Sequence, residues 1–127
     1  MSKLMKYDEL YKALVENAAL MAKVSGIYDS PQGDAAPPYI EMSTVQEVND
    51  ELLDNSGAEV TVDLDIWAQA DAVAGARKQI LEIRDLIVIA IPSWALYDGI
   101  AIMRDAGNPD WWHGVATIRY YDNRRTD

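Results

Sequence analysis

The chain has 127 residues, half of them hydrophobic, and a formal net charge of −10. This length predicts a single domain over residues 1–127 that can bury a hydrophobic core without stabilising cross-links. The absence of cysteine excludes disulfides and thiolate metal sites. The longest apolar run, residues 86–91, is far too short to span a bilayer, and no segment resembles a signal peptide. We therefore expect a soluble protein that is made in a cytoplasm and has no membrane contact.

The negative charge is concentrated in one segment. Residues 24–76 contain eleven Asp or Glu and no Lys or Arg, whereas the remainder carries ten acidic and eleven basic residues. Such a segment repels nucleic acid phosphate and is not expected to bind it. One interpretation is a solvated surface. The other is a functional surface that either contacts a basic partner or prevents DNA from binding.

The first predicted element is a helix over about residues 7–23, because apolar residues recur there every three or four positions. Its stripe consists of Tyr7, Leu10, Tyr11, Leu14, Ala18 and Met21. Residues 28–38 are rich in Pro, Gly and Asp and predict a loop. A strand over residues 39–45 follows. The polar residues 46–56 predict either a long hairpin arm or a short helix, and the pattern does not decide between them.

The second strand shows strict alternation. Val60, Val62, Leu64 and Ile66 point one way, and Thr61, Asp63, Asp65 and Trp67 point the other. A second helix follows, with Asp71 as its expected N-cap. Its apolar stripe consists of Val73, Ala76, Ile80, Ile83 and Ile87. Pro92 is expected to close this helix.

Two further strands are predicted near the end, over about residues 97–105 and 112–121, with a turn at 106–110 between them. Residues 122–127 are polar and are expected to be a mobile tail. The predicted class is α+β: an antiparallel or mixed sheet of about four strands with two helices packed on one face, in the order α-β-β-α-β-β.

The sequence contains few residues in arrangements typical of catalysis or metal binding. His113 is the only histidine, and its neighbours Trp112 and Gly114 provide no catalytic or metal partner. Asp63 and Asp65 share a strand face and could hold a hard cation, but a solvated or interface face is the better interpretation. No phosphate loop, dinucleotide fingerprint or nucleophile elbow occurs. We therefore predict no catalytic, cofactor-binding or metal-binding residues, no cofactor, and no enzyme.

Tryptophans indicate contact surfaces instead. Trp111 and Trp112 adjoin a turn and face opposite ways, so one can enter the core while the other covers something else. Trp67 shares its face with Asp63 and Asp65. It is either a core aromatic under the first helix or an anchor at a subunit interface.

The order of these motifs resembles the tail completion, or tail terminator, proteins of long-tailed bacteriophages and related particles, over about residues 8–122. The resemblance rests on the segment IYDSPQGDAAPPYI, a strand VxLxIW that leads into a helix AxxAR, and a final strand ATIRYYD. Each motif alone has low specificity, and the resemblance depends on the order and spacing of the motifs.

The resemblance implies a structural subunit that forms a homo-hexameric ring on the head-proximal end of the tail tube in the virion. Its expected partners are its own copies, the tail tube protein and the head-side connector, while DNA passes through without specific binding. The residues expected to line the channel or a subunit contact are Glu47, Asp50, Glu51, Asp54, Asp63, Asp65, Trp67 and Trp111.

Three alternatives stay open. The nearest is another head–tail connector or minor tail protein of similar fold. The second is a small-ligand or metal-binding domain, or a hydrolase, that uses the acidic pair. The third is an acidic mimic that occupies a basic nucleic-acid-binding protein.

Overall fold

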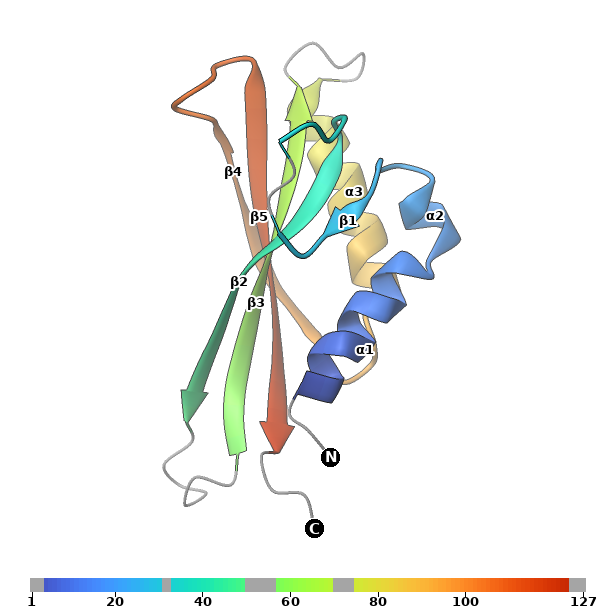
Figure 1. The fold of residues 1–127 in the computed structure, drawn as a ribbon, viewed down its shortest axis with the longest axis vertical. Coiled ribbons are helices and arrows are strands. Elements are labelled where there is room, and N and C mark those ends of the chain that lie inside the picture. The colour runs from blue at the N-terminus through green and yellow to red at the C-terminus, as the bar shows by residue number, and fades with distance from the viewer. Residues whose placement is uncertain (1–3, 31–32, 50–56, 70–74, 124–127) are drawn as a thin grey trace.

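A computed structural model describes residues 4–30, 33–49, 57–69 and 75–123. Its elements in chain order are α1 (Leu4–Val15), α2 (Ala18–Met21), β1 (Ile27–Tyr28), β2 (Tyr39–Asn49), β3 (Gly57–Gln69), α3 (Ala76–Ala90), β4 (Leu96–Arg104) and β5 (Trp111–Asn123). Figure 1 shows the long strands side by side and the helices gathered on one side of them. None of the described helices is long and apolar enough to cross a membrane.

The strands form one mixed sheet in the order β1-β2-β3-β5-β4. β1 runs parallel to β2, and the other neighbours are antiparallel. The α+β class and the mixed sheet are confirmed, but the expected four strands and two helices are not: the described residues form five strands and three helices. The additional strand, β1, has only two residues, which pair with Ile40 and Glu41. Such a short strand depends on its partner and leaves no periodic signal in the sequence.

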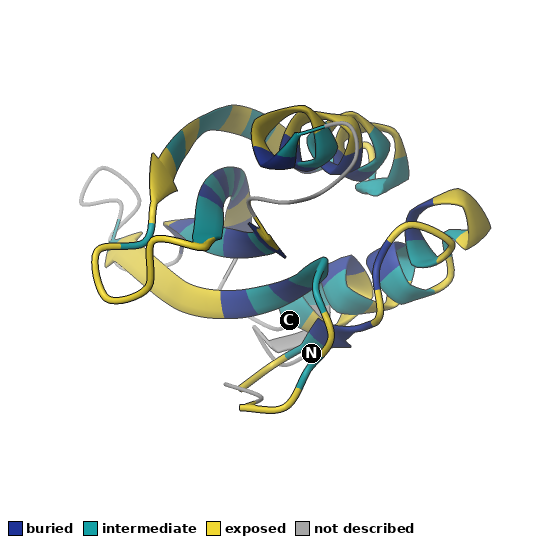
Figure 2. Cartoon of the chain, turned by 90° about the horizontal axis from the view of Figure 1, so that it is seen from above, coloured by how far each residue is buried: buried dark blue, intermediate teal, exposed yellow. Residues whose placement is uncertain are grey.

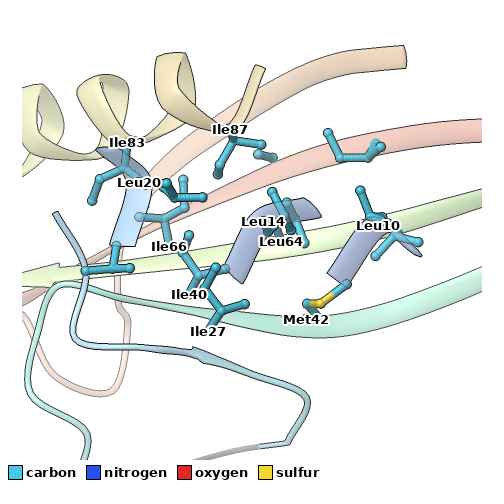
Figure 3. Packing of buried hydrophobic residues seen from close by; sticks show 14 of the residues in the cluster. Leu10, Leu14, Leu20, Ile27, Ile40, Met42, Leu64, Ile66, Ile83 and Ile87 are labelled. Atoms are coloured by element: carbon cyan, nitrogen blue, oxygen red, sulfur yellow. The ribbon is translucent and has the colours of Figure 1, made fainter. Parts of the chain in front are cut away.

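The core lies between the sheet and the helices. The predicted stripe of Val60, Val62, Leu64 and Ile66 is buried along β3, and the second face of that strand points away from the helices. From the helices, the buried side chains are Leu10, Leu14, Leu20, Ala76, Ile80, Ile83 and Ile87. Figure 3 shows helix residues such as Leu14, Leu20 and Ile83 meeting strand residues such as Leu64 and Ile66, and Figure 2 shows that the buried positions of the helices face the sheet. Each fully buried Leu or Ile contributes about 1.5–3 kcal/mol.

The first predicted helix is divided in two. Asn17 interrupts it, and its side-chain Oδ1 accepts a hydrogen bond of 2.9 Å from the backbone N–H of Leu20. An Asn side chain that binds a backbone donor in this way starts a new helix rather than continuing the old one. The break also shifts the buried stripe, since Leu20 is buried and Ala18 is exposed.

The second predicted helix begins later than expected. α3 starts at Ala76, with Gly75 at the N-cap position and a positive φ of 86°. The expected cap Asp71 and the stripe residue Val73 lie outside the described residues. The helix ends as predicted, because Ile91 is extended in front of Pro92.

Two strands run further than the pattern indicated. β2 continues through Asn49 in antiparallel pairing with β3, so residues 46–49 form a hairpin arm and not a helix. β5 continues through Asn123, and Asp122 is buried opposite Ala58. Residues 122 and 123 therefore belong to the sheet and not to the expected tail, while residues 124–127 lie outside the described part.

Candidate functional site

The candidate functional site is the face of the sheet that the helices leave uncovered, called the open face below. Its side chains alternate with those of the core along β2, β3, β5 and β4. The strand register places them in rows across the sheet. The open face includes Tyr39, Glu41, Asp63, Asp65, Trp67, Trp111, His113 and Thr117.

Five rings form a continuous row across the open face. Tyr28 meets Tyr39 edge-on, Tyr39 meets Trp111, and Trp111 meets Trp67, with centroid separations of 5.9, 6.2 and 6.2 Å. His113 then stacks flat on Trp67, with centroids 4.1 Å apart. Aromatic pairs of this kind each contribute about 0.5–1.5 kcal/mol beyond their buried area. This aromatic row links β1, β2, β3 and β5.

The row excludes one of the two interpretations of Trp67. The helices cover the opposite face of the sheet, so Trp67 is not a core aromatic under the first helix. It is half-buried by Trp111 and His113 on the open face. Trp111 lies in the same row, while Trp112 faces the helix side, as expected for consecutive strand residues.

The two predicted carboxylates do share this face. Asp63 accepts a hydrogen bond of 3.0 Å from the hydroxyl of Thr117. Asp65 is only 8% exposed, and its Oδ2 lies 3.3 Å from Nε2 of His113. That nitrogen is buried and makes no hydrogen bond, so its contact with Asp65 is a close approach and not a hydrogen bond. Both carboxylates are therefore held within the sheet.

A third carboxylate joins them from β2. Glu41 is the direct partner of Asp65 in the register. Burial and the charge of Asp65 raise the pKa of Glu41 above its ordinary value of 4.5, and His113 opposes that shift. No group of three or more His, Cys, Asp or Glu in the described ranges could hold a metal ion.

Glu47 lies apart from this cluster. Its register partner is Val60, so it projects from the helix side of β2, near the end of the sheet. There it borders a groove of about 310 Å³ lined by Tyr7, Asp29, Val45, Glu47, Val60, Tyr120 and Asp122. Burial, with the charges of Asp122 and Glu47, raises the pKa of Tyr120 to about 12. The expected residues Asp50, Glu51 and Asp54 lie outside the described residues.

The charge asymmetry of the sequence becomes an asymmetry of the fold. The segment without Lys or Arg, residues 24–76, provides β1, β2 and β3, which form one half of the sheet. The other half, together with α3, has mixed charges: it carries the basic residues Arg77, Lys78, Arg84, Arg104 and Arg119 and the acidic residues Glu82, Asp85, Asp98, Asp105, Asp110 and Asp122. Arg77 and Arg104 both pack on the ring of Trp112, at 4.8 and 5.1 Å from its centroid. One half of the sheet is therefore purely acidic, and the other half carries charges of both signs.

The sequence interpretation missed the partners of His113 and the roles of Tyr28 and Tyr39. His113 meets Trp67 and Asp65 only because β5 pairs with β3 in one particular register. Alternation identifies the face of each residue, but it does not say which residue lies opposite which. For Tyr39 and His113 the available signal was their place on predicted strands, whereas Tyr28 fell in a predicted loop and gave none.

Comparison with known proteins gives a consistent picture. A family model described as "Tail completion protein gp17" matches residues 8–121. No curated protein sequence matches the chain. Two solved structures share the fold at low identity. One, described as the structure of the bacteriophage SPP1 gp17 protein, is 17% identical with a TM-score of 0.62, over 98% of this chain and 94% of that one. The other, from the virion of a native gene transfer agent particle, is 18% identical with a TM-score of 0.61, over 90% and 91%.

Proposed function

The chain belongs to the tail completion protein gp17 family, and on this premise we propose that it caps the head-proximal end of a phage tail tube as a homo-hexameric ring. The ring stops polymerisation of the tube and presents the surface on which the head-side connector docks. The chain thus acts as a structural part of the virion and not as an enzyme. The family match over residues 8–121 is the observation that carries this proposal.

The charge asymmetry supports assembly into a closed ring. A ring of identical subunits uses a head-to-tail contact, in which one surface of a copy meets a different surface of the next. An acidic half without any Lys or Arg and a second half with charges of both signs suit this requirement, because only the second half offers cations to the acidic half of the next copy. Like charges would repel in a symmetric contact between two acidic edges.

The acidic half also suits a channel through which DNA passes. A wall that neutralised phosphates would bind DNA and hold it, whereas an acidic wall repels it. We assign the channel to Asp63 and Asp65 of the open face, and we assign Glu47, which projects from the helix side, to a subunit contact. Asp65 is nearly covered within the subunit, so its contribution is to the electric field and not to direct contact.

The aromatic row supplies a surface for a protein partner. Trp67 and Trp111 combine a large apolar area with ring edges that are fixed by their neighbours. Residues of this type dominate the energy of protein interfaces when a partner buries them. We assign the open face near these two residues to contacts within the ring or with the tube.

Tail assembly with and without the protein tests the proposed function. In its presence, electron microscopy should show tubes of uniform length that end in one ring each, and light scattering should give the ring a hexameric mass. In its absence, tubes should grow to variable lengths and fail to join heads. Uniform, joinable tubes in its absence would contradict the proposal.

A different head–tail connector or minor tail protein is the competing assignment. Copy number and position distinguish the two, because a terminator occurs as one ring per tail at the end of the tube. Gold labelling of a tagged chain on complete particles locates it. Labels along the tube, or on the head side of the connector, would favour the competing assignment.

A further inference from the structure

Two arginines share one aromatic ring. The guanidinium groups of Arg77 and Arg104 lie 4.8 and 5.1 Å from the ring centroid of Trp112. Both are within the roughly 6 Å over which a cation and an aromatic ring attract each other. Three elements build this arrangement, because Arg77 stands in the first turn of α3, Arg104 ends β4, and Trp112 is the register partner of Arg104 on β5. These three residues are called the arginine clamp below.

The arginine clamp combines a fixed platform with free donors. Trp112 is half-buried and packs against the hydrophobic core, which holds its ring in place, whereas both arginines are exposed. A guanidinium that packs on a ring keeps its N–H groups for other partners, and its planar fork matches the two oxygens of a carboxylate. The clamp is therefore organised for a carboxylate before any partner arrives.

Neither guanidinium of the clamp makes an ion pair with a carboxylate in the part of the chain that the structure describes. Two cations on one ring repel each other, and a bound anion would offset that repulsion. The remaining described arginines are already paired, in the contacts Arg84–Asp85, Arg119–Glu59 and Arg119–Asp98. Of the described arginines, the two in the clamp are thus the ones that can still bind an anion.

The surroundings of the clamp carry charges of both signs. Lys78 follows Arg77 in the chain, while Glu82 stands one turn further along α3, and Asp105 and Asp110 belong to the turn between β4 and β5. These charges nearly cancel, so the local field is too weak to hold the phosphates of a nucleic acid, which needs several cations. A single carboxylate that binds the guanidinium fork at short range fits this setting better.

The acidic segment, residues 24–76, offers one carboxylate of this kind. Of its exposed Asp and Glu residues that the structure describes, three already have partners within the chain: Asp29, Glu47 and Glu59. The fourth, Asp34, is exposed and makes no contact with a partner in the described ranges. An exposed carboxylate without a partner and a pair of guanidiniums without one are complementary.

Asp34 and the clamp lie at the same end of the sheet, on opposite edges. Asp34 stands in the loop that leads into β2 at Tyr39, and the register continues from Tyr39 through β3 and β5 to Met103 of β4. Arg104 follows in the next row, and the order β1-β2-β3-β5-β4 puts the loop and Arg104 on opposite edges. Figure 1 shows this loop and the β4–β5 turn at the upper end of the molecule.

We propose that the arginine clamp binds the carboxylate of Asp34 from a second copy of this chain. Copies that stand side by side around an axis along the strands bring these two groups to the same height. The contact is head-to-tail, because each copy carries the clamp on one edge and Asp34 on the other, and it closes into a ring when the rotation between copies divides a full turn. This inference rests on the ring assembly in the proposed function and identifies the groups that join its subunits.

An exchange of charges tests this contact. Arg104→Glu and Asp34→Arg should each weaken ring assembly by about tenfold, the effect of roughly 1.4 kcal/mol, because each places like charges in the contact. The double variant should recover the assembly constant to within about threefold of the wild type. Light scattering measures the assembly constants. Both positions are exposed, so urea unfolding should give all three variants the midpoint of the wild type.

The matched controls make the same changes of charge on α1. Lys12→Glu and Glu9→Arg alter exposed residues of that helix and should leave the assembly constant unchanged. If these controls weaken assembly as much as Arg104→Glu and Asp34→Arg do, the effect comes from net charge and the inference is wrong.

A chemical cross-link identifies the occupant of the clamp. Arg104→Lys places an amine there, and a carbodiimide joins an amine to a carboxylate in direct contact as an amide, with loss of water. Treated rings should give covalent oligomers on a denaturing gel, and mass spectrometry should find position 104 linked to Asp34. Adding Asp34→Asn should remove this linked pair. Assembled rings that never yield the pair would overturn the inference.

Further outcomes separate the contact from the proposed function. Rings that cap tubes and assemble equally well with every charge variant would overturn the contact and leave capping intact. A wild type that stays monomeric, alone and on tubes, would overturn both. Recovery of assembly in the double variant, with tubes of uniform length in the absence of the protein, would overturn capping and keep the contact. Binding of duplex DNA that Arg104→Glu abolishes, with unchanged ring assembly, would assign the clamp to phosphate and overturn the inference.

Discussion

His113 lies flat against Trp67, with ring centroids 4.1 Å apart and planes 3° from parallel. The two residues are direct partners in the register of β3 and β5, although they are far apart in the sequence. The same histidine approaches Asp65 through Nε2, at 3.3 Å. One side chain thus joins the aromatic row to the carboxylates of the open face.

Removing Trp67 should weaken the open face without disrupting the core. The change Trp67→Ala loses the stack on His113 and the edge contact with Trp111, and we expect a cost of about 2 kcal/mol, below the 3–5 kcal/mol typical of a fully buried Trp. Trp67→Phe keeps an aromatic ring and should cost about half as much. Urea unfolding measures both. Equal stability of Trp67→Ala and the wild type would show that the row contributes nothing to the isolated subunit.

Glu41 should make stability depend on pH in the mildly acidic range. Burial and the charge of Asp65 raise the pKa of Glu41 in the folded protein above its ordinary value of 4.5. At a pH between 4.5 and this raised pKa, the folded state therefore binds more protons than the unfolded state. The contribution of Glu41 to the free energy of unfolding is therefore most favourable below pH 4.5. It becomes less favourable as the pH rises through the raised pKa.

The change Glu41→Gln removes this dependence. The variant should melt at a higher temperature than the wild type at pH 7, and the difference should shrink toward zero below pH 4.5. Thermal unfolding followed by circular dichroism over this pH range measures the effect. A difference that grows as the pH falls would have the opposite sign and contradict the prediction.

Gly114 of β5 lies directly against Ile80 of α3. A methyl group there would lie 2.5 Å from Cγ2 of Ile80, so Gly114→Ala forces the helix away from β5. We expect a loss of about 1–3 kcal/mol, the usual cost of overpacking. Gly33→Ala is the control, because nothing lies within 4 Å of that position. Chemical denaturation should separate the two variants clearly, and equal midpoints would argue against this packing.

Two isoleucines on α3 test which side of the helix faces the core. Ile87 is fully buried and Ile89 is 75% exposed. Ile87→Ala should cost about 2–5 kcal/mol, whereas Ile89→Ala should stay within about 0.5 kcal/mol of the wild type. Unfolding midpoints in urea give both values. A reversed order would mean that the helix lies on the sheet with another face.

Local periodicity predicted much of the fold. The alternation from Val60 to Ile66 and the spacing of Ile80, Ile83 and Ile87 identified a half-buried strand and a one-sided helix, and the structure buries the expected side chains. The placement of Asp63, Asp65 and Trp67 on one common face followed from the same alternation. Breaks that depend on one side chain were missed, such as the cap that Asn17 forms for α2.

Of the candidate site, the sequence by itself determined the face of each residue and the acidic character of residues 24–76. The tertiary structure alone decided that Asp65 meets His113, that Glu47 lies on the other face, and that the acidic segment forms one half of a single sheet. The physical reason is that alternation and helical spacing are properties of neighbouring residues. Strand order and register, in contrast, depend on how distant segments pack together, and a local pattern carries no information about them.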